Sequence, residues 1–372
     1  MADEQRLPGL DIVRALAITL VVVAHGALLA APAISFSLRS QLLYLGGYTG
    51  VELFFALSGF LIVGGLLRQL DTRPVLDGRA VITFWQRRWW RTLPNYAVFL
   101  SLNATLFAAW FQTPTPGAHY ILFLQNLAWP HPSAMPEAWS LAVEEWFYLL
   151  MPLLLMLSLK FLPQPRKAVP LLLALWVVVG ALARFAVAYL MEPEWDVGIR
   201  KIALLRLDAI AWGGLAACWL HYRPAQAKRA AYPCYWLGVF GLLASSIWLA
   251  VGVTHRFQPL MAYVGLFTLT GASAALCLPW AAQWRPRRVR FMPPITWLSR
   301  ISYSLYLTHF SFALPLMQLP IVAAYMALPW RLLGYVIISL VAAYAAYRLI
   351  ETPALALRDR PLALKTSDTK NF

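Results

Sequence analysis

The sequence predicts an all-α, polytopic membrane protein: a bundle of about ten transmembrane helices with both termini in the cytoplasm. Two features of its composition indicate a membrane. Of its 372 residues, 60% are hydrophobic, and the mean hydropathy is +0.62. A water-exposed fold of this length could not bury so much apolar surface. A bilayer accommodates it, because each span takes about 20 mostly apolar residues. The third feature, the placement of basic residues, predicts the orientation.

Ten apolar segments are long enough to be spans. They are residues 10–31, 42–67, 92–111, 139–159, 169–191, 202–220, 232–253, 259–280, 295–318 and 330–350. The broken stretch 118–129 is interpreted as a re-entrant or interfacial piece. Residues 10–31 are interpreted as a retained helix rather than a signal peptide, because Arg14 and His25 lie within them. Removing this helix would also leave the later spans with the wrong parity.

The formal net charge of +15 follows the predicted topology. With a cytoplasmic N-terminus, the basic residues of the outer loops are Arg39, Arg200, Lys201, Arg256 and Arg331. The inner loops hold many more, namely Arg68, Arg73, Arg79, Arg87, Arg88, Lys160, Arg166, Lys167, Arg223, Lys228, Arg229, Arg285, Arg287, Arg288 and Arg290. This is the positive-inside pattern, which places both termini in the cytoplasm. The basic charge therefore indicates topology, and no nucleic acid is expected as a partner.

The spans form a single predicted membrane domain, residues 1–357, followed by a short polar cytoplasmic tail at 358–372. The cysteines Cys218, Cys234 and Cys277 are scattered, and the six histidines show no metal-ligand spacing. Neither a disulfide framework nor a metal site is therefore expected. The oligomeric state stays open.

The first span carries an arginine and a histidine on one face. Arg14 and His25 are eleven residues apart, close to three helical turns, which places them about 16 Å apart along the axis. Asp11, three residues before Arg14, lies on nearly the same face. Ionisable groups at membrane depth usually face a cavity or the bundle interior. The alternative is that Arg14 reaches the lipid headgroups and His25 binds a backbone carbonyl.

Later spans also contain polar and ionisable residues. They are Glu52 and Ser58 in the second span, Arg88 and Arg91 at the inner start of the third, Glu144 near the outer end of the fourth, Arg206 and Asp208 in the sixth, and Tyr303 and His309 in the ninth. Arg88 and Arg91 share a helix face. Arg206 and Asp208, two residues apart, cannot face each other, so each is expected to pair with another helix.

Together these stretches resemble the membrane acyltransferase-3 family, multi-span enzymes that O-acylate extracytoplasmic glycans and some lipids and small molecules. The resemblance covers almost the whole chain. Its motifs are Arg-x10-His at 14–25, FFALSGFLI at 54–62, Arg-x-x-Arg followed by Leu-Pro at 88–94, WSL-x-x-E at 139–144, Arg-x-Asp at 206–208, YSLYL-x-H at 303–309, and ETP at 351–353 followed by Arg358. The family has ten core spans, in agreement with the hydropathy count.

The resemblance implies transfer of an acyl group, most often acetyl, from cytoplasmic acyl-coenzyme A (acetyl-CoA). The acceptor would be a hydroxyl of an extracytoplasmic carbohydrate, such as O-antigen, exopolysaccharide or a lipid-linked saccharide. The implied location is a bacterial inner membrane, with membrane lipid as a further partner. Arg88 and Arg91 suit bidentate recognition of the donor's phosphates. Arg14 lies along the expected path of the donor.

His25 is the predicted catalytic group, because an imidazole exchanges its proton near neutral pH. It acts either as general base or as the nucleophile of an acyl relay. A carboxylate could hold the ring in one tautomer. Glu144, predicted at a similar depth, is the first candidate for this partner, followed by Asp208 and Glu52. Asp11 is expected to orient Arg14.

The remaining polar residues are expected on the acceptor side, and His309 either contacts the acceptor or makes a structural hydrogen bond. The predicted acceptor-side residues are Glu52, Ser58, Arg206, Asp208, Tyr303 and His309. Two alternatives stay open. One is acyl transfer to a small-molecule or lipid acceptor. The other is a transporter of a glycan or small metabolite, for which related halves with paired broken helices would be expected.

Overall fold

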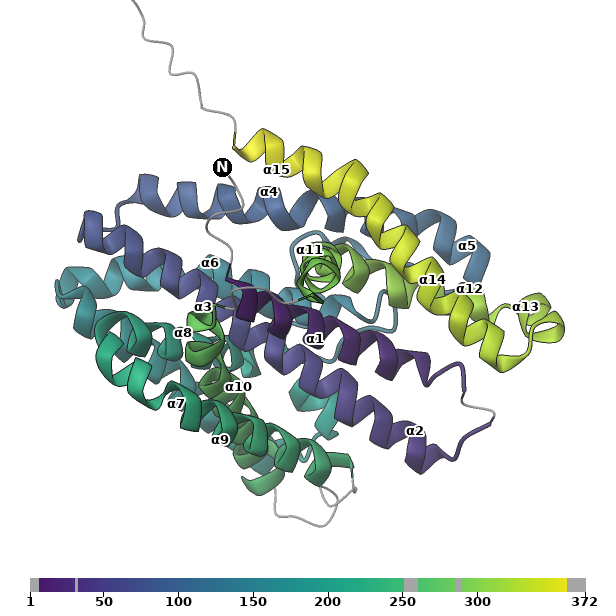
Figure 1. Cartoon of the computed structure of the whole chain (residues 1–372), viewed down its shortest axis with the longest axis horizontal. Coiled ribbons are helices and arrows are strands. Elements are labelled where there is room, and N and C mark those ends of the chain that lie inside the picture. The colour runs from purple at the N-terminus through teal and green to yellow at the C-terminus, as the bar shows by residue number, and fades with distance from the viewer. Residues whose placement is uncertain (1–6, 31–32, 251–259, 286–289, 360–372) are drawn as a thin grey trace, which may run out of the picture.

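The computed structural model describes residues 7–30, 33–250, 260–285 and 290–359. These ranges form helices joined by loops and contain no strand, which confirms the predicted all-α class (Figure 1). Eight of the described stretches are long and apolar enough to cross a membrane. They are Pro8–Gly26, Leu38–Thr72, Ala138–Phe161, Pro165–Met191, Ala203–Tyr222, Pro224–Ala250, Met261–Gln283 and Leu328–Arg358. The chain is therefore a polytopic, integral membrane protein.

The helices follow the order of the predicted spans. The first half of the chain forms α1 (Pro8–Gly26), α2 (Phe36–Leu42), η1 (Leu43–Tyr48), α3 (Thr49–Thr72), α4 (Gly78–Leu102), η2 (Asn103–Phe107), α5 (Ala108–Phe111), η3 (Ala118–Tyr120), α6 (Ala138–Phe161) and α7 (Pro165–Met191). The second half forms η4 (Asp196–Arg200), η5 (Ala203–Leu205), α8 (Leu207–Tyr222), α9 (Pro224–Ala250), η7 (Leu260–Gly265), α10 (Leu266–Gln283), α11 (Met292–Thr308), η8 (His309–Ala313), α12 (Leu314–Gln318), α13 (Pro320–Tyr325), α14 (Leu328–Ala346), η9 (Tyr347–Glu351) and α15 (Thr352–Arg358).

Two of the ten predicted spans lie in helical stretches that are not among the eight apolar ones. Residues 92–111 belong to α4, η2 and α5, and residues 295–318 belong to α11, η8 and α12. No charged residue lies in 92–111, but Pro94, Asn95 and Asn103 lower the hydropathy of this stretch. The stretch 118–129 forms the short helix η3 and successive turns. Arg256, Arg287, Arg288 and the predicted tail from residue 360 onward lie outside the described ranges.

Helix α1 lies in the middle of the bundle and packs against α3, α10 and α11. Helices α4 and α15 run along one edge of the molecule, and α7 and α9 run along the opposite edge (Figure 1). The contact between α3 and α8 is especially close, because a Cβ atom at Gly59 would lie only 1.8 Å from the carbonyl oxygen of Ile210. Small residues allow such backbone approach between membrane helices. The crossing fixes the position of α3, which lines both of the cavities described below.

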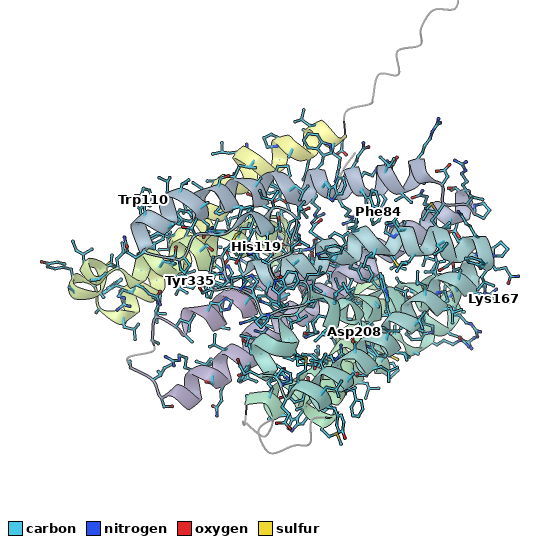
Figure 2. The ribbon with its side chains drawn as sticks, turned by 180° about the vertical axis from the view of Figure 1, so that it is seen from behind. Phe84, Trp110, His119, Lys167, Asp208 and Tyr335 are labelled. Atoms are coloured by element: carbon cyan, nitrogen blue, oxygen red, sulfur yellow. The ribbon has the colours of Figure 1, made fainter. Side chains whose placement is uncertain are left out.

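Two ion pairs are buried where α7, α8 and α3 meet. The guanidinium group of Arg184 donates to both carboxylate oxygens of Asp208, at 2.7 and 2.8 Å. Arg206 donates to Glu52 at 2.5 Å, and its guanidinium lies 4.1 Å from the centre of the Phe267 ring. Figure 2 shows Asp208 among the helices, in contrast to Lys167 at the edge of the bundle. The prediction that Arg206 and Asp208 each pair with another helix is confirmed.

We expect loss of Arg184 to be among the most destabilising single changes. In an Arg184→Met variant, Asp208 remains as a buried and uncompensated carboxylate, which costs about 3–5 kcal/mol of unfolding free energy. The double variant Arg184→Met with Asp208→Leu should recover part of this loss, since no charge is then stranded. Thermal unfolding in detergent measures both changes.

The matched control for this experiment is Arg73→Met. Arg73 pairs with Asp77 at 3.1 Å, but its side chain is 70% exposed. An exposed pair contributes at most about 1 kcal/mol. Equal loss of stability in the Arg73 and Arg184 variants would contradict a structural role for the buried pair.

Candidate active site

Two adjoining cavities inside the bundle share two lining residues, Val51 of α3 and Tyr306 of α11. The first, termed the arginine cavity, has as its polar lining Arg14, Ser58, Arg88, Arg91, Thr92, Ser140, Glu144, Tyr148, Ser302, Tyr303 and Tyr306. The second, termed the histidine cavity, is lined in part by His25, Tyr44, Gly47, Glu137, Trp139 and Arg200. The residues singled out at the two ends of the Arg-x10-His motif thus lie in neighbouring cavities.

The arginine cavity collects cations from two helices. Arg14 comes from α1, and Arg88 and Arg91 come from the same face of α4. The side chain of Arg14 is held by a small network, in which it donates to the hydroxyl of Ser299 at 3.3 Å. Ser299 in turn donates to Asp11 at 2.6 Å, and the nearest oxygen of Asp11 lies 3.7 Å from Arg14. Asp11 therefore lies where it can orient Arg14.

Glu144 also belongs to the arginine cavity. It accepts hydrogen bonds from Ser58 at 3.0 Å and from Tyr148, one turn further along α6, at 2.7 Å. The Arg88 guanidinium lies 5.8 Å from the centre of the Tyr148 ring. The predicted pairing of Glu144 with His25 is therefore not the arrangement that the structure has. Depth in the membrane suggested this pair, but α6 presents Glu144 toward Ser58 on α3.

The partner of His25 is His309. The Nδ1 atom of His25 lies 2.9 Å from Nε2 of His309, and the two rings are stacked with an interplanar angle of 21°. The Nδ1 atom of His309 lies 3.0 Å from the carbonyl oxygen of Leu305. His309 is fully buried and is the first residue of the π-helical turn η8. Wider turns of this kind are frequent at functional sites.

These distances select one tautomer for each neutral ring. A carbonyl oxygen only accepts, so Nδ1 of His309 carries the hydrogen that it donates to Leu305. In a neutral imidazole the other nitrogen is then an acceptor, so Nε2 of His309 receives the hydrogen on Nδ1 of His25. It follows that Nε2 of neutral His25 has an available lone pair. This is the protonation state that a general base requires.

The Nε2 atom of His25 lies beside the histidine cavity. It is 3.9 Å from the position that a Cβ atom would occupy at Gly47, which itself lines this cavity. The absence of a side chain at Gly47 leaves room next to the nitrogen. His25 is only partly buried, whereas His309 behind it is fully buried. The partly buried ring of His25 therefore faces the cavity, and the fully buried ring of His309 supports it.

His309, one of the six predicted acceptor-side residues, pairs with His25, and the structure separates the other five into two groups. Ser58 and Tyr303 line the arginine cavity, where the hydroxyl of Tyr303 donates to the carbonyl of Thr92 at 2.8 Å. Glu52, Arg206 and Asp208 form the buried ion pairs described above. Their fully desolvated, paired charges fit a structural role better than contact with a substrate.

Asp196, which lines the histidine cavity, binds two cations. It accepts from Nε of Arg200 and from Nζ of Lys201, at 2.5 and 2.6 Å. Burial alone would raise the pKa of Asp196, but the two neighbouring cations outweigh it and lower that pKa to about 2. The Arg200 guanidinium lies 4.7 Å from the centre of the Trp139 ring. This wall thus combines charged groups with an indole face.

Sequence reasoning missed several of these residues. Arg184 lies in the fifth predicted span, so its charge at membrane depth was a signal that could have been used. Tyr148 follows Glu144 by four residues, the spacing of neighbours on a helix surface. The roles of Tyr306, Glu137 and Arg200 have no comparable local signal, because they depend on which helices meet.

Comparison with known proteins agrees with this architecture. Residues 7–348 match the acyltransferase-3 family, whose description is "Acyltransferase domain". The chain therefore belongs to the membrane acyltransferase-3 family.

Similar proteins include a peptidoglycan O-acetyltransferase of Listeria monocytogenes, 26% identical, and a putative peptidoglycan O-acetyltransferase of Bacillus subtilis, 27% identical. Each alignment covers 93% of this chain, and 55% and 54% of the relative, respectively. An O-acetyltransferase of Staphylococcus aureus is 25% identical over 83% of the chain and 51% of the relative. The chain thus spans about half the length of these relatives. No solved structure matches it.

Proposed function

We propose that the chain transfers an acetyl group from cytoplasmic acetyl-CoA to a hydroxyl group of an extracytoplasmic glycan. The observation that carries this proposal is the junction of the two cavities. One offers three arginines, and the other offers His25 with an available lone pair on Nε2. The names of the relatives favour peptidoglycan as the first acceptor to test, beside O-antigen and exopolysaccharide.

The donor is proposed to bind with its phosphates in the arginine cavity. Arg88 and Arg91 there present planar guanidinium groups, which match phosphate oxygens in bidentate geometry. Arg14 supplies a third cation, from α1. The thioester at the other end of the donor then lies at the junction with the histidine cavity. In this arrangement the acceptor hydroxyl lies between Nε2 of His25 and the reacting carbonyl.

In the proposed step, the acceptor oxygen attacks the thioester carbonyl while Nε2 of His25 takes the hydroxyl proton. The new carbon–oxygen bond forms and the carbon–sulfur bond breaks. The leaving thiolate of coenzyme A then takes the proton from the His25 imidazolium, which returns the ring to its neutral state. The bond from Nδ1 of His25 to His309 keeps the ring in the required tautomer throughout.

The test uses inverted membrane vesicles, in which the cytoplasmic face is outward, prepared with and without the chain. Acetyl-labelled CoA is added to the outside, and label is followed into glycan in the lumen. We expect label in glycan only when the chain is present and only when donor reaches the cytoplasmic face. Protein-dependent flux of a glycan or metabolite without any label transfer would contradict the enzyme and favour a transporter.

A further inference from the structure

Val51 and Tyr306 are the residues common to the linings of both cavities, so the two cavities meet at these side chains, and their meeting point is termed the throat. Each belongs to a helix that borders both cavities. On α3, Val51, Phe54 and Ser58 follow one another at helical spacing down the arginine cavity. On the other side, Tyr303 and Tyr306 of α11 do the same. The two lining stripes therefore both lead to the shared residues.

Tyr306 is a rigid wall of this throat. Its hydroxyl donates to the carbonyl of Glu137 at 3.1 Å and shares a hydrogen bond with Ser140 at 2.6 Å. Its ring packs between Phe54 and His309, with centroid separations of 6.4 and 5.7 Å. A side chain held at its tip and on both sides cannot swing aside without breaking several contacts. The width of the throat is therefore set from this side.

Val51, the second residue of the throat, is equally constrained. A β-branched side chain in a helix has one strongly preferred rotamer. The helix itself cannot retreat, because at the preceding residue, Gly50, a Cβ atom would lie 2.6 Å from the carbonyl oxygen of Ala17 on α1. Since α1 also carries His25, the same close packing sets the throat and the catalytic nitrogen relative to each other.

We propose that the two cavities open into each other between Val51 and Tyr306, and that these two side chains select the acyl group by its width. This inference rests on the proposed function. The acyl group is the leading end of a donor whose phosphates lie at Arg88 and Arg91. All of it must therefore pass the throat before the thioester carbonyl reaches His25. A linear chain is no wider than the methyl group of acetyl, whereas a chain branched next to the carbonyl is wider.

The test compares two isomeric donors, butyryl-CoA and isobutyryl-CoA, which have equal numbers of carbon atoms and differ in width. Transfer of each acyl group to glycan is measured as kcat/KM in membranes, with acetyl-CoA alongside. We expect the wild type to prefer butyryl over isobutyryl by roughly tenfold or more, the usual effect of one methylene-sized misfit. In Val51→Ala the preference should fall by roughly tenfold, since the opposite wall has been cut back.

Val63→Ala is the matched control. It makes the same truncation on α3 at a fully buried position away from both cavity linings, so it should leave the isomer preference unchanged. The preference is a ratio measured on one protein, so loss of folded enzyme does not alter it. If wild type, Val51→Ala and Val63→Ala had the same preference for butyryl over isobutyryl, selection by the throat would be disproved, and acyl transfer itself would not be. Absence of transfer by the wild type from all three donors would overturn the proposed function, and the throat with it.

Discussion

In a His25→Ala variant, we expect acetyl transfer to glycan to fall by about 100-fold to 10,000-fold, the range that a positioned general base supplies. The alanine leaves no group beside Gly47 to take the hydroxyl proton of the acceptor. Donor binding should be unchanged, because His25 does not belong to the lining of the arginine cavity. Initial rates from labelled acetyl-CoA, at matched amounts of protein, measure the first effect. The donor KM measures the second.

The matched control is His221→Ala. His221 lies in α8, where it interacts with Asp71 at 3.1 Å, and neither residue lines the two cavities. Its loss should leave the rate within about twofold of wild type, as is usual for surface changes. A His25→Ala enzyme as fast as the His221→Ala enzyme would remove His25 from the chemistry.

His309→Ala tests the positioning role of the second ring. This change leaves Nδ1 of His25 without the acceptor that selects its tautomer. We expect a lower kcat with an unchanged donor KM.

If His25 were instead an acyl relay, label would accumulate covalently on the wild-type protein in the absence of acceptor and would be absent from His25→Ala. That outcome would replace direct transfer.

We expect loss of Arg88 or Arg91 to weaken binding of the donor and to leave the rate of the chemical step unchanged. A hydrogen bond to a charged group contributes about 1.5–3 kcal/mol, so Arg88→Ala and Arg91→Ala should each raise the KM for acetyl-CoA by roughly tenfold to 100-fold. Lysine at either position should restore donor binding only in part, because it keeps the positive charge and loses the bidentate geometry. Donor titrations of the initial rate provide the measurement.

The control for these variants is Arg87→Ala, on the same helix but exposed and outside the cavity lining. Acetyl-dephospho-CoA, which lacks the 3′-phosphate, sharpens the experiment. A variant that has lost its contact with this phosphate should have the same KM for acetyl-CoA and for acetyl-dephospho-CoA. If the donor KM stayed at the wild-type value in both α4 variants and in Arg87→Ala, the phosphates would have to bind elsewhere.

Much of the candidate site was accessible from local patterns. The Arg-x10-His spacing predicted that Arg14 and His25 share a face, and they line neighbouring cavities. The Arg88 and Arg91 spacing likewise placed both side chains in one cavity. Such relations hold within one helix, whose period is known in advance.

The partner of His25 was not accessible in this way. The predicted depth of Glu144 in the membrane suggested it as the partner, but depth does not determine how a helix is rotated about its axis and thus which neighbour a side chain faces. In the structure Glu144 faces Ser58, and His309 occupies the place beside His25. Glu52 and Asp208, the other candidates, are each held by an arginine.

By itself the sequence determined that this protein is a helical membrane bundle, and that several ionisable residues, among them Arg14, His25 and Glu144, lie inside it. Hydropathy, helical period and loop charge are properties of short segments, so they can be read without the fold. Only the tertiary structure decided which side chains meet. The His25–His309 contact joins residues 284 positions apart, and the Glu52–Arg206 pair joins residues 154 apart. Contacts between helices depend on rotation, tilt and close approach, which no single span encodes.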